Sequence, residues 1–170
     1  MQSFVRQICS ALDYLHNEKQ MIHKDIKPQN ILLDKSAKTF KLGDLGVSTH
    51  LTKTLCTKEA SQGTMRYMPP EQLNGKLSLK SDIWSLGCVL LEMCTGKPPF
   101  FDIENEITMS MRIVRGENPL YYATKKYREQ LGLISKDSGL QDLIQKCLSV
   151  NYKLRPTAPE ILSHPFMSLF

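Results

Sequence analysis

The sequence HKDIKPQNILLDKSAKTFKLGDLG occupies residues 23–46 and carries the densest pattern in the chain. Two short apolar runs, residues 31–33 and 40–42, flank a polar segment at residues 34–38. Such an arrangement predicts a β-hairpin, here a loose one because its turn contains neither Asn-Gly nor Asp-Gly. The stretch therefore predicts two short antiparallel strands joined by a polar turn.

Polar side chains stand directly before and after this predicted hairpin. Asn30 precedes the first strand and Asp44 follows the second, so antiparallel pairing brings both to the same open end. An amide oxygen and a carboxylate so placed suit Mg²⁺, which few protein groups hold together with substrate phosphates. Asp25 lies on the preceding loop, which Pro28 stiffens. Lys27 is close enough along the chain to reach the same space.

Two motifs within this stretch resemble those of protein kinases. Residues 23–30 resemble the catalytic loop H-R-D-x-x-x-x-N, and residues 44–46 resemble D-F-G. Each motif alone is a weak signal, but the two in order around a hairpin are specific. Downstream, residues 63–71 resemble the family's substrate-docking stretch that ends in A-P-E, and residues 81–87 continue the match.

The resemblance covers nearly the whole chain and implies an α+β, mainly helical fold. It implies the C-terminal lobe of a protein kinase, with the catalytic and metal-binding loops on a short β-hairpin. Residues 1–170 are then one partial kinase domain, with an activation segment at residues 44–71. The N-terminal β-rich lobe is expected to be absent, because neither G-x-G-x-x-G nor a V-A-I-K-like lysine occurs.

The resemblance also implies a role for each polar residue at the hairpin mouth. Asp25 is the implied catalytic base, and Lys27 neutralises charge on the transferred phosphate. Asn30 and Asp44 are the implied ligands of Mg²⁺, and with Lys27 they form the ATP-binding set. Lys27, and Thr64 after a glycine, resemble serine/threonine rather than tyrosine kinases. The alternatives are a turn-capping aspartate, a solvated lysine and two turn residues at strand ends.

Three functions are open from the sequence. The first is a serine/threonine protein kinase that uses ATP and Mg²⁺ and acts on a protein substrate. The second is a non-catalytic, pseudokinase-like scaffold that binds protein partners. The third is a basic module that binds nucleic acid, which we do not expect because the net charge of +5 is scattered without a basic-aromatic platform. The intact polar set favours the kinase, with impaired turnover in the absence of the other lobe.

Composition sets further limits on location and partners. Five cysteines without a C-x-x-C pair disfavour a disulfide scaffold or zinc site and favour the reduced thiols of a cytoplasmic protein. The longest apolar run, residues 83–91, is shorter than the about 20 residues of a membrane span, so no membrane is expected. A missing lobe leaves apolar surface in water, which invites a partner chain that covers it.

Apolar spacing predicts the main helices. One begins near Met1 and continues to about Asn17, and a second, apolar on nearly all faces, covers residues 81–95 with Ser81 as its cap. Residues 103–114 and 140–148 carry further helical patterns. Little periodicity is present in residues 116–136. Before the C-terminus, Thr157 with Glu160 predicts a capping box that opens a short helix.

Three further expectations concern polar residues outside the hairpin. Asp82 either suits the dipole at its helix N-terminus or, as the resemblance implies, braces the catalytic loop. Glu71 and Arg155 are implied to form a buried ion pair. His23 is expected to be a packed structural histidine.

In the activation segment we favour Thr57 and Ser61 as phosphorylation sites. Their cation is expected to be Lys24, which replaces the family's arginine and, as a point charge, makes a weaker switch.

Overall fold

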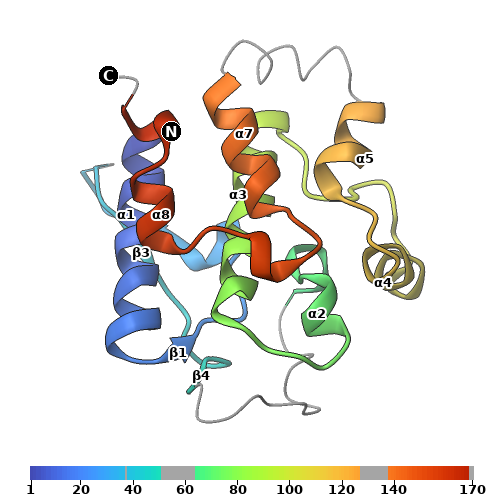
Figure 1. Ribbon diagram of the computed structural model, residues 1–170, viewed down its shortest axis with the longest axis horizontal. Helices are drawn as coiled ribbons and strands as arrows, with labels where there is room; N and C mark the ends of the chain where they lie inside the picture. The colour runs from blue at the N-terminus through green and yellow to red at the C-terminus, as the bar shows by residue number, and fades with distance from the viewer. Residues whose placement is uncertain (37, 51–63, 127–137, 169–170) are drawn as a thin grey trace.

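The computed structural model describes residues 1–36, 38–50, 64–126 and 138–168, and these residues are mainly helical (Figure 1). The helices are α1 (Gln2–Asp13), α2 (Pro70–Leu73), α3 (Leu79–Thr95), α4 (Glu106–Val114), α5 (Pro119–Lys126), α7 (Ser138–Cys147) and α8 (Ala158–Leu162). The strands are β1 (Met21–Ile22), β2 (Ile31–Leu33), β3 (Phe40–Leu42) and β4 (Thr49–His50). Single 3₁₀ turns occupy Pro28–Asn30, Met65–Tyr67, Tyr152–Leu154 and Pro165–Ser168.

Helix α1 packs against α8 and β3 through one apolar face. Its buried residues recur at helical spacing, as the sequence predicted: Phe4, Val5, Ile8, Cys9 and Leu12. The helix continues into a π-helical turn at Tyr14–Glu18, so the prediction of a helix to about Asn17 is confirmed with a changed geometry at its end. A π-helical turn contains one residue more than an α-helical turn. His16, which lies in this turn, is buried.

Helix α3 runs through the centre of the molecule beside α7 (Figure 1). It is buried on nearly every face, as its apolar sequence predicted. The predicted cap was wrong: the helix begins at Leu79 with Ser78 as the N-cap, and Ser81 Oγ accepts the Ser78 N–H at 3.3 Å. Gly87 permits the close approach to α7, because a Cβ there would lie 2.8 Å from Cys147 Cβ.

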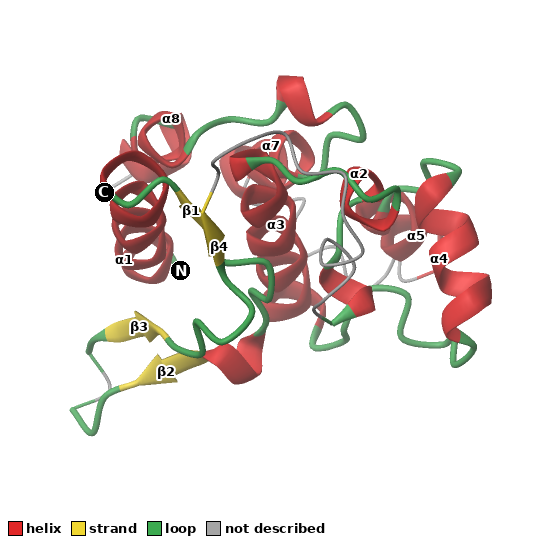
Figure 2. Cartoon of the chain, turned by 90° about the horizontal axis from the view of Figure 1, so that it is seen from below, coloured by secondary structure: helices red, strands yellow, loops and turns green. Residues whose placement is uncertain are grey.

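The predicted hairpin is confirmed. Strands β2 and β3 pair antiparallel with Ile31 opposite Leu42 and Leu33 opposite Phe40. In the turn, Asp34 Oδ1 accepts the N–H groups of residues 38 and 39, each at 3.0 Å, which replaces the tight turn that the sequence lacks. Figure 2 shows the hairpin extending from the helical body at the end of α1.

The β1–β4 strand pair and helix α5 lacked a usable signal in the sequence. Strands β1 and β4 pair antiparallel over two residues each, which is too short for a periodic pattern. Helix α5 lies inside residues 116–136, for which no helix was predicted, and Asn118 Oδ1 accepts the Leu120 N–H at 2.8 Å at its start.

The remaining predicted helices are present with adjusted ends. The 103–114 pattern corresponds to α4, which begins only at Glu106 because Asn105 caps it, and the 140–148 pattern corresponds to α7. The capping box before α8 is confirmed, since Glu160 accepts the Thr157 N–H at 2.6 Å.

Two findings bear on the remaining expectations. In the described part of the chain, no helix combines the length and the apolar character needed to span a bilayer. Of the expected activation segment, residues 44–50 and 64–71 are described, and Thr57 and Ser61 lie outside the described residues.

Candidate functional site

The loop between β1 and β2 is held from below by Asp82, in the first turn of α3. Asp82 is fully buried, and its two oxygens accept the backbone N–H groups of His23 at 2.9 Å and Lys24 at 3.0 Å. These bonds hold Lys24 at a φ of +71°, a conformation that a lysine rarely adopts. The predicted brace is therefore confirmed. Sequence reasoning missed His16, whose Nε2 lies 2.7 Å from Asp82 Oδ2.

His23 ties the loop to the hairpin. It is fully buried, as expected for a structural histidine, and its Nε2 lies 3.0 Å from the carbonyl oxygen of Gly43. The Gly43 N–H in turn donates to the Asn30 carbonyl oxygen at 2.8 Å. Asn30 thus stands opposite Gly43, and Asp44 is the next residue along the chain. The polar residues that flank the hairpin lie at its same end, as predicted, with the register shifted by one residue.

Asp25 is the centre of a cluster of four polar residues. Its Oδ2 lies 2.7 Å from Lys27 Nζ and accepts from Asn30 Nδ2 at 2.9 Å. Its Oδ1 accepts the Thr64 N–H at 2.8 Å, and Lys27 Nζ donates to Thr64 Oγ1 at 2.7 Å. Thr64 was not predicted as a site residue, although its place after Gly63 was a signal that the sequence offered. The structure thus brings Asp25, Lys27 and Asn30 together.

The environment of Asp25 favours its ionised form. Partial burial raises the pKa of this carboxyl, but the hydrogen bonds from Lys27 and Thr64 together outweigh burial and bring the pKa below its ordinary value. Within the described residues, Asp25 Oδ2 is shared by Lys27 and Asn30, and Oδ1 accepts the Thr64 N–H.

Asn30 and Asp44 carry the two side-chain oxygens that the sequence predicts as magnesium ligands. Both Asn30 Nδ2 hydrogens point to Asp25, one to its carbonyl oxygen at 2.8 Å, which orients Asn30 Oδ1 the other way. Asp44 is exposed at a φ of +57°, and the Gly46 N–H donates to its Oδ1 at 3.1 Å. Among the described residues no three His, Cys, Asp or Glu side chains form a metal cage. Two oxygen ligands suit Mg²⁺, which retains waters and substrate phosphates.

An open groove of about 470 Å³ lies beside the Asp25 cluster. Its lining residues are Lys27, Gln29, Asn30, Thr64, Arg66, Tyr67, Glu92 and Pro98. The Tyr67 hydroxyl donates to Glu92 Oε2 at 2.6 Å, and burial, reinforced by Glu92, raises the pKa of Tyr67. The groove therefore brings together residues of the loop before β2, the turn before α2 and α3.

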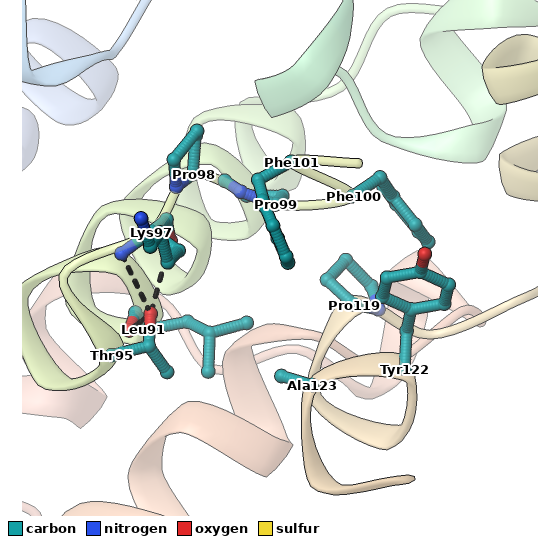
Figure 3. A pocket seen from close by; sticks show the side chains of 10 residues that line it. All are labelled: Leu91, Thr95, Lys97, Pro98, Pro99, Phe100, Phe101, Pro119, Tyr122 and Ala123. Atoms are coloured by element: carbon teal, nitrogen blue, oxygen red, sulfur yellow. Dashed lines mark hydrogen bonds between the residues drawn. The ribbon is translucent and has the colours of Figure 1, made fainter. Parts of the chain in front are cut away.

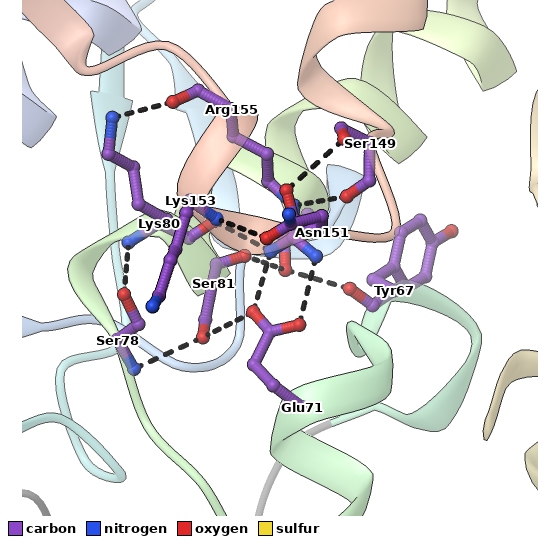
Figure 4. Close-up of polar contacts among 10 residues, drawn as sticks. Tyr67, Glu71, Ser78, Lys80, Ser81, Ser149, Asn151, Lys153 and Arg155 are labelled. Atoms are coloured by element: carbon purple, nitrogen blue, oxygen red, sulfur yellow. Dashed lines mark hydrogen bonds and ion pairs between the residues drawn. The ribbon is translucent and has the colours of Figure 1, made fainter. Parts of the chain in front are cut away.

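Helix α2 is anchored by the predicted ion pair between Glu71 and Arg155 (Figure 4). Arg155 donates from two nitrogens to the Glu71 carboxylate at 2.6 and 2.9 Å, and both side chains are buried. Arg155 Nε also donates to the Ser149 carbonyl, and Ser81 Oγ donates to Glu71. This network joins α2, α3 and the loop after α7.

Comparison with known proteins identifies the class. Residues 1–167 match the family described as the protein kinase domain, so the chain belongs to the protein kinase family and has its mainly helical domain fold.

The curated relatives are serine/threonine protein kinases. Over 168 residues the chain is 41% identical to mitogen-activated protein kinase kinase kinase 1 of Arabidopsis thaliana, covering 96% of this chain and 25% of that protein. It is 36% identical over 166 residues to serine/threonine-protein kinase pakC of Dictyostelium discoideum, covering 97% and 32%. It is 33% identical over 176 residues to mitogen-activated protein kinase kinase 2 of Arabidopsis thaliana, covering 100% and 46%. The chain thus spans between a quarter and about half the length of these relatives.

Proposed function

We propose that this chain carries the catalytic loop of a serine/threonine protein kinase, which transfers the γ-phosphate of ATP to a serine or threonine hydroxyl of a protein. The observation that carries the proposal is Asp25, anchored by Lys27, Asn30 and Thr64 at the edge of an open groove. The similarity to relatives that are named as protein kinases also supports phosphate transfer to a protein.

Asp25 acts as the base in this proposal. Its depressed pKa keeps it ionised at neutral pH, and in the proposed reaction its carboxylate accepts the proton of the substrate hydroxyl. Asn30 and Thr64 hold the carboxylate in one orientation, which places the hydroxyl oxygen for attack. Lys27, shared between Asp25 and Thr64, provides positive charge where the transferred phosphate passes.

Asn30 and Asp44 are the proposed ligands of Mg²⁺. An ion held by these two residues would supply positive charge that offsets the negative charge of the phosphates during transfer. Asn30 contributes its amide oxygen, which its own bonds to Asp25 orient, and Asp44 contributes an exposed carboxylate at the end of the hairpin. Lys27 completes the proposed ATP-binding set.

Residues 1–170 are, in this proposal, a partial kinase domain with its activation segment at 44–71. Apolar side chains around the hairpin support a further lobe or a partner chain above it, since Leu32, Leu33 and Leu45 are each at least half exposed. The cytoplasmic location expected from the cysteines stays a prediction.

Phosphate transfer to serine- and threonine-containing peptides tests the proposal. We expect transfer well below the ordinary enzyme median of about 10 s⁻¹, because no glycine-rich phosphate loop occurs in these 170 residues. Asp25→Asn should lower the rate by about 10²–10⁴-fold, and the matched surface variant Asp13→Asn should not. A rate that Asp25→Asn leaves unchanged contradicts the proposal. If the wild-type chain transfers no phosphate at all, the non-catalytic scaffold becomes the better account.

A further inference from the structure

The groove beside Asp25 carries a positive charge that the proposed transfer does not use. Arg66, on the turn Met65–Tyr67, lines this groove together with Lys27 and Glu92. Lys27 is paired with Asp25 at 2.7 Å, and the proposed transfer already assigns its charge to the phosphate. Arg66 donates only to neutral carbonyl oxygens, and within the described residues no carboxylate lies in ion-pair distance of it. Its charge is therefore uncompensated by direct contact.

The guanidinium of Arg66 is held firmly in position. Its Nη1 donates to the carbonyl oxygens of Pro99 at 3.2 Å and Phe100 at 2.6 Å, and its Nη2 donates to Ile103 at 2.8 Å. These carbonyls belong to the turn after α3, which Figure 3 shows facing α5. The Phe100 side chain is 2% exposed and packs on Tyr122 at 5.1 Å between ring centroids. The Arg66 guanidinium and the turn that accepts its hydrogen bonds are therefore both held in place.

This arrangement leaves Arg66 able to bind one more group. A guanidinium has five N–H donors, of which three are used here. The Nε–H and one Nη2–H have no acceptor in the described part of the chain. A carboxylate or a phosphate accepts two such bonds from one arginine, and the charge strengthens both. Because the side chain is already immobilised, little conformational entropy is lost on binding.

We propose that Arg66 selects protein substrates that carry an acidic side chain, a carboxylate or a phosphorylated residue, near the hydroxyl to be phosphorylated. The inference rests on the proposed function, because that function places the acceptor hydroxyl at Asp25. Glu92 lines the same groove and accepts from the neutral Tyr67 hydroxyl, so the groove also holds a negative charge. An acidic residue therefore strengthens binding only at substrate positions that reach Arg66. At other positions it brings no gain in affinity.

Binding of labelled peptides to the whole chain, followed by fluorescence anisotropy, tests this inference. Each peptide holds one serine in an alanine background, with a single glutamate, phosphoserine or lysine moved through the neighbouring positions. We expect glutamate or phosphoserine at a narrow range of positions to lower the Kd about tenfold, equivalent to about 1.4 kcal/mol, relative to lysine. Tighter binding of phosphoserine than of glutamate there identifies a phosphorylated substrate, and equal binding identifies a carboxylate.

The variant Arg66→Glu should reverse the preference toward lysine at those positions. Arg115→Glu is the matched control, since Arg115 is exposed, does not line the groove and undergoes the same change of charge. If the melting temperature shows that Arg66→Glu is unfolded, the positional series on the wild-type chain decides alone.

Equal affinity for glutamate and lysine peptides overturns the inference, as does an absence of binding by every peptide. A uniform gain for glutamate at all positions also overturns it, because the net charge of +5 explains such a gain without Arg66. Phosphate transfer is measured separately, so a chain that transfers phosphate without the positional preference retains the proposed function and loses only this inference.

Discussion

At the scale of single residues, the site depends on the groups that bind the Asp25 carboxylate. Asp25 is 9% exposed, and burial alone disfavours its charge. Lys27, Asn30 and Thr64 each make a short contact with the carboxylate, and the contacts of Lys27 and Thr64 bring its pKa below the ordinary value despite burial. Asn30 serves twice, because the amide nitrogen that holds Asp25 leaves the amide oxygen for a metal ion. In the proposed function, Asn30 therefore links the base, Asp25, to the metal site.

This geometry predicts a pH dependence for Asp25. Because its folded pKa is depressed, the stability that it contributes is complete above the ordinary aspartate pKa of about 3.9 and is lost as pH falls through the lower folded value. Denaturant unfolding measured between neutral pH and acid should show that loss in the wild type and less of it in Asp25→Asn. Equal acid sensitivity of the two proteins contradicts the proposed environment of Asp25.

Residue-level prediction from sequence succeeded where the motif itself contains the contact. Asp25, Lys27 and Asn30 are close along the chain, so a short loop suffices to bring them together. The sequence did not reveal the contacts of Thr64 or His16, because these residues reach their partners across long stretches of chain. Asp44 is located at the hairpin end as expected, and its proposed metal contact stays a prediction.

At the scale of elements, α3 is the platform on which the site is built. Its first turn presents Asp82 to the loop between β1 and β2, and Glu92 near its other end lines the groove. Its centre is apolar and packs against α7. The hydrophobic run of this helix was readable from sequence, whereas its start was displaced because Ser78 and Ser81 share the capping role.

The ion pair between Glu71 and Arg155 yields a prediction at the same scale. Arg155→Ala leaves the buried Glu71 carboxylate without its partner and should lower the free energy of unfolding by about 3–5 kcal/mol. The double variant Glu71→Leu with Arg155→Met, measured by the same denaturant unfolding, should recover much of that loss because no unpaired charge remains. A loss below about 1 kcal/mol for Arg155→Ala is the value of an exposed pair and contradicts the account.

At the scale of the whole molecule, a tight helical core supports an open polar face. The core includes three fully buried thiols, of Cys9, Cys88 and Cys147, contributed by α1, α3 and α7. Burial raises the pKa of Cys9 to about 12 and also raises the pKa of the other two. These thiols are therefore protonated at neutral pH and shielded from reagents.

The buried thiols predict a labelling pattern. After brief exposure of the native protein to N-ethylmaleimide, mass spectrometric mapping should find Cys9, Cys88 and Cys147 unmodified and the partly exposed Cys94 modified first. In guanidinium chloride all four should react. Labelling of any core thiol as fast as Cys94 in the native state contradicts the packing of α1, α3 and α7.

The global architecture was predictable from sequence to the extent that motifs and periodicity carried it. The mainly helical class, the hairpin and the central helix followed from local patterns. The β1–β4 pairing and α5 did not, because the first is too short and the second lacks a regular apolar stripe. Tertiary contacts, rather than local sequence, decide both.

The central claim is that Asn30 and Asp44 bind a nucleotide-bound metal ion beside Asp25. The most direct measurement is an NMR spectrum of the amide groups in which Mn²⁺, with ATP present, broadens signals close to the bound ion. We expect broadening centred on Asn30 and on residues 43–46, which Asp44→Ala abolishes and the surface variant Asp13→Ala preserves. Broadening centred elsewhere, or the same broadening in Asp44→Ala, contradicts the claim.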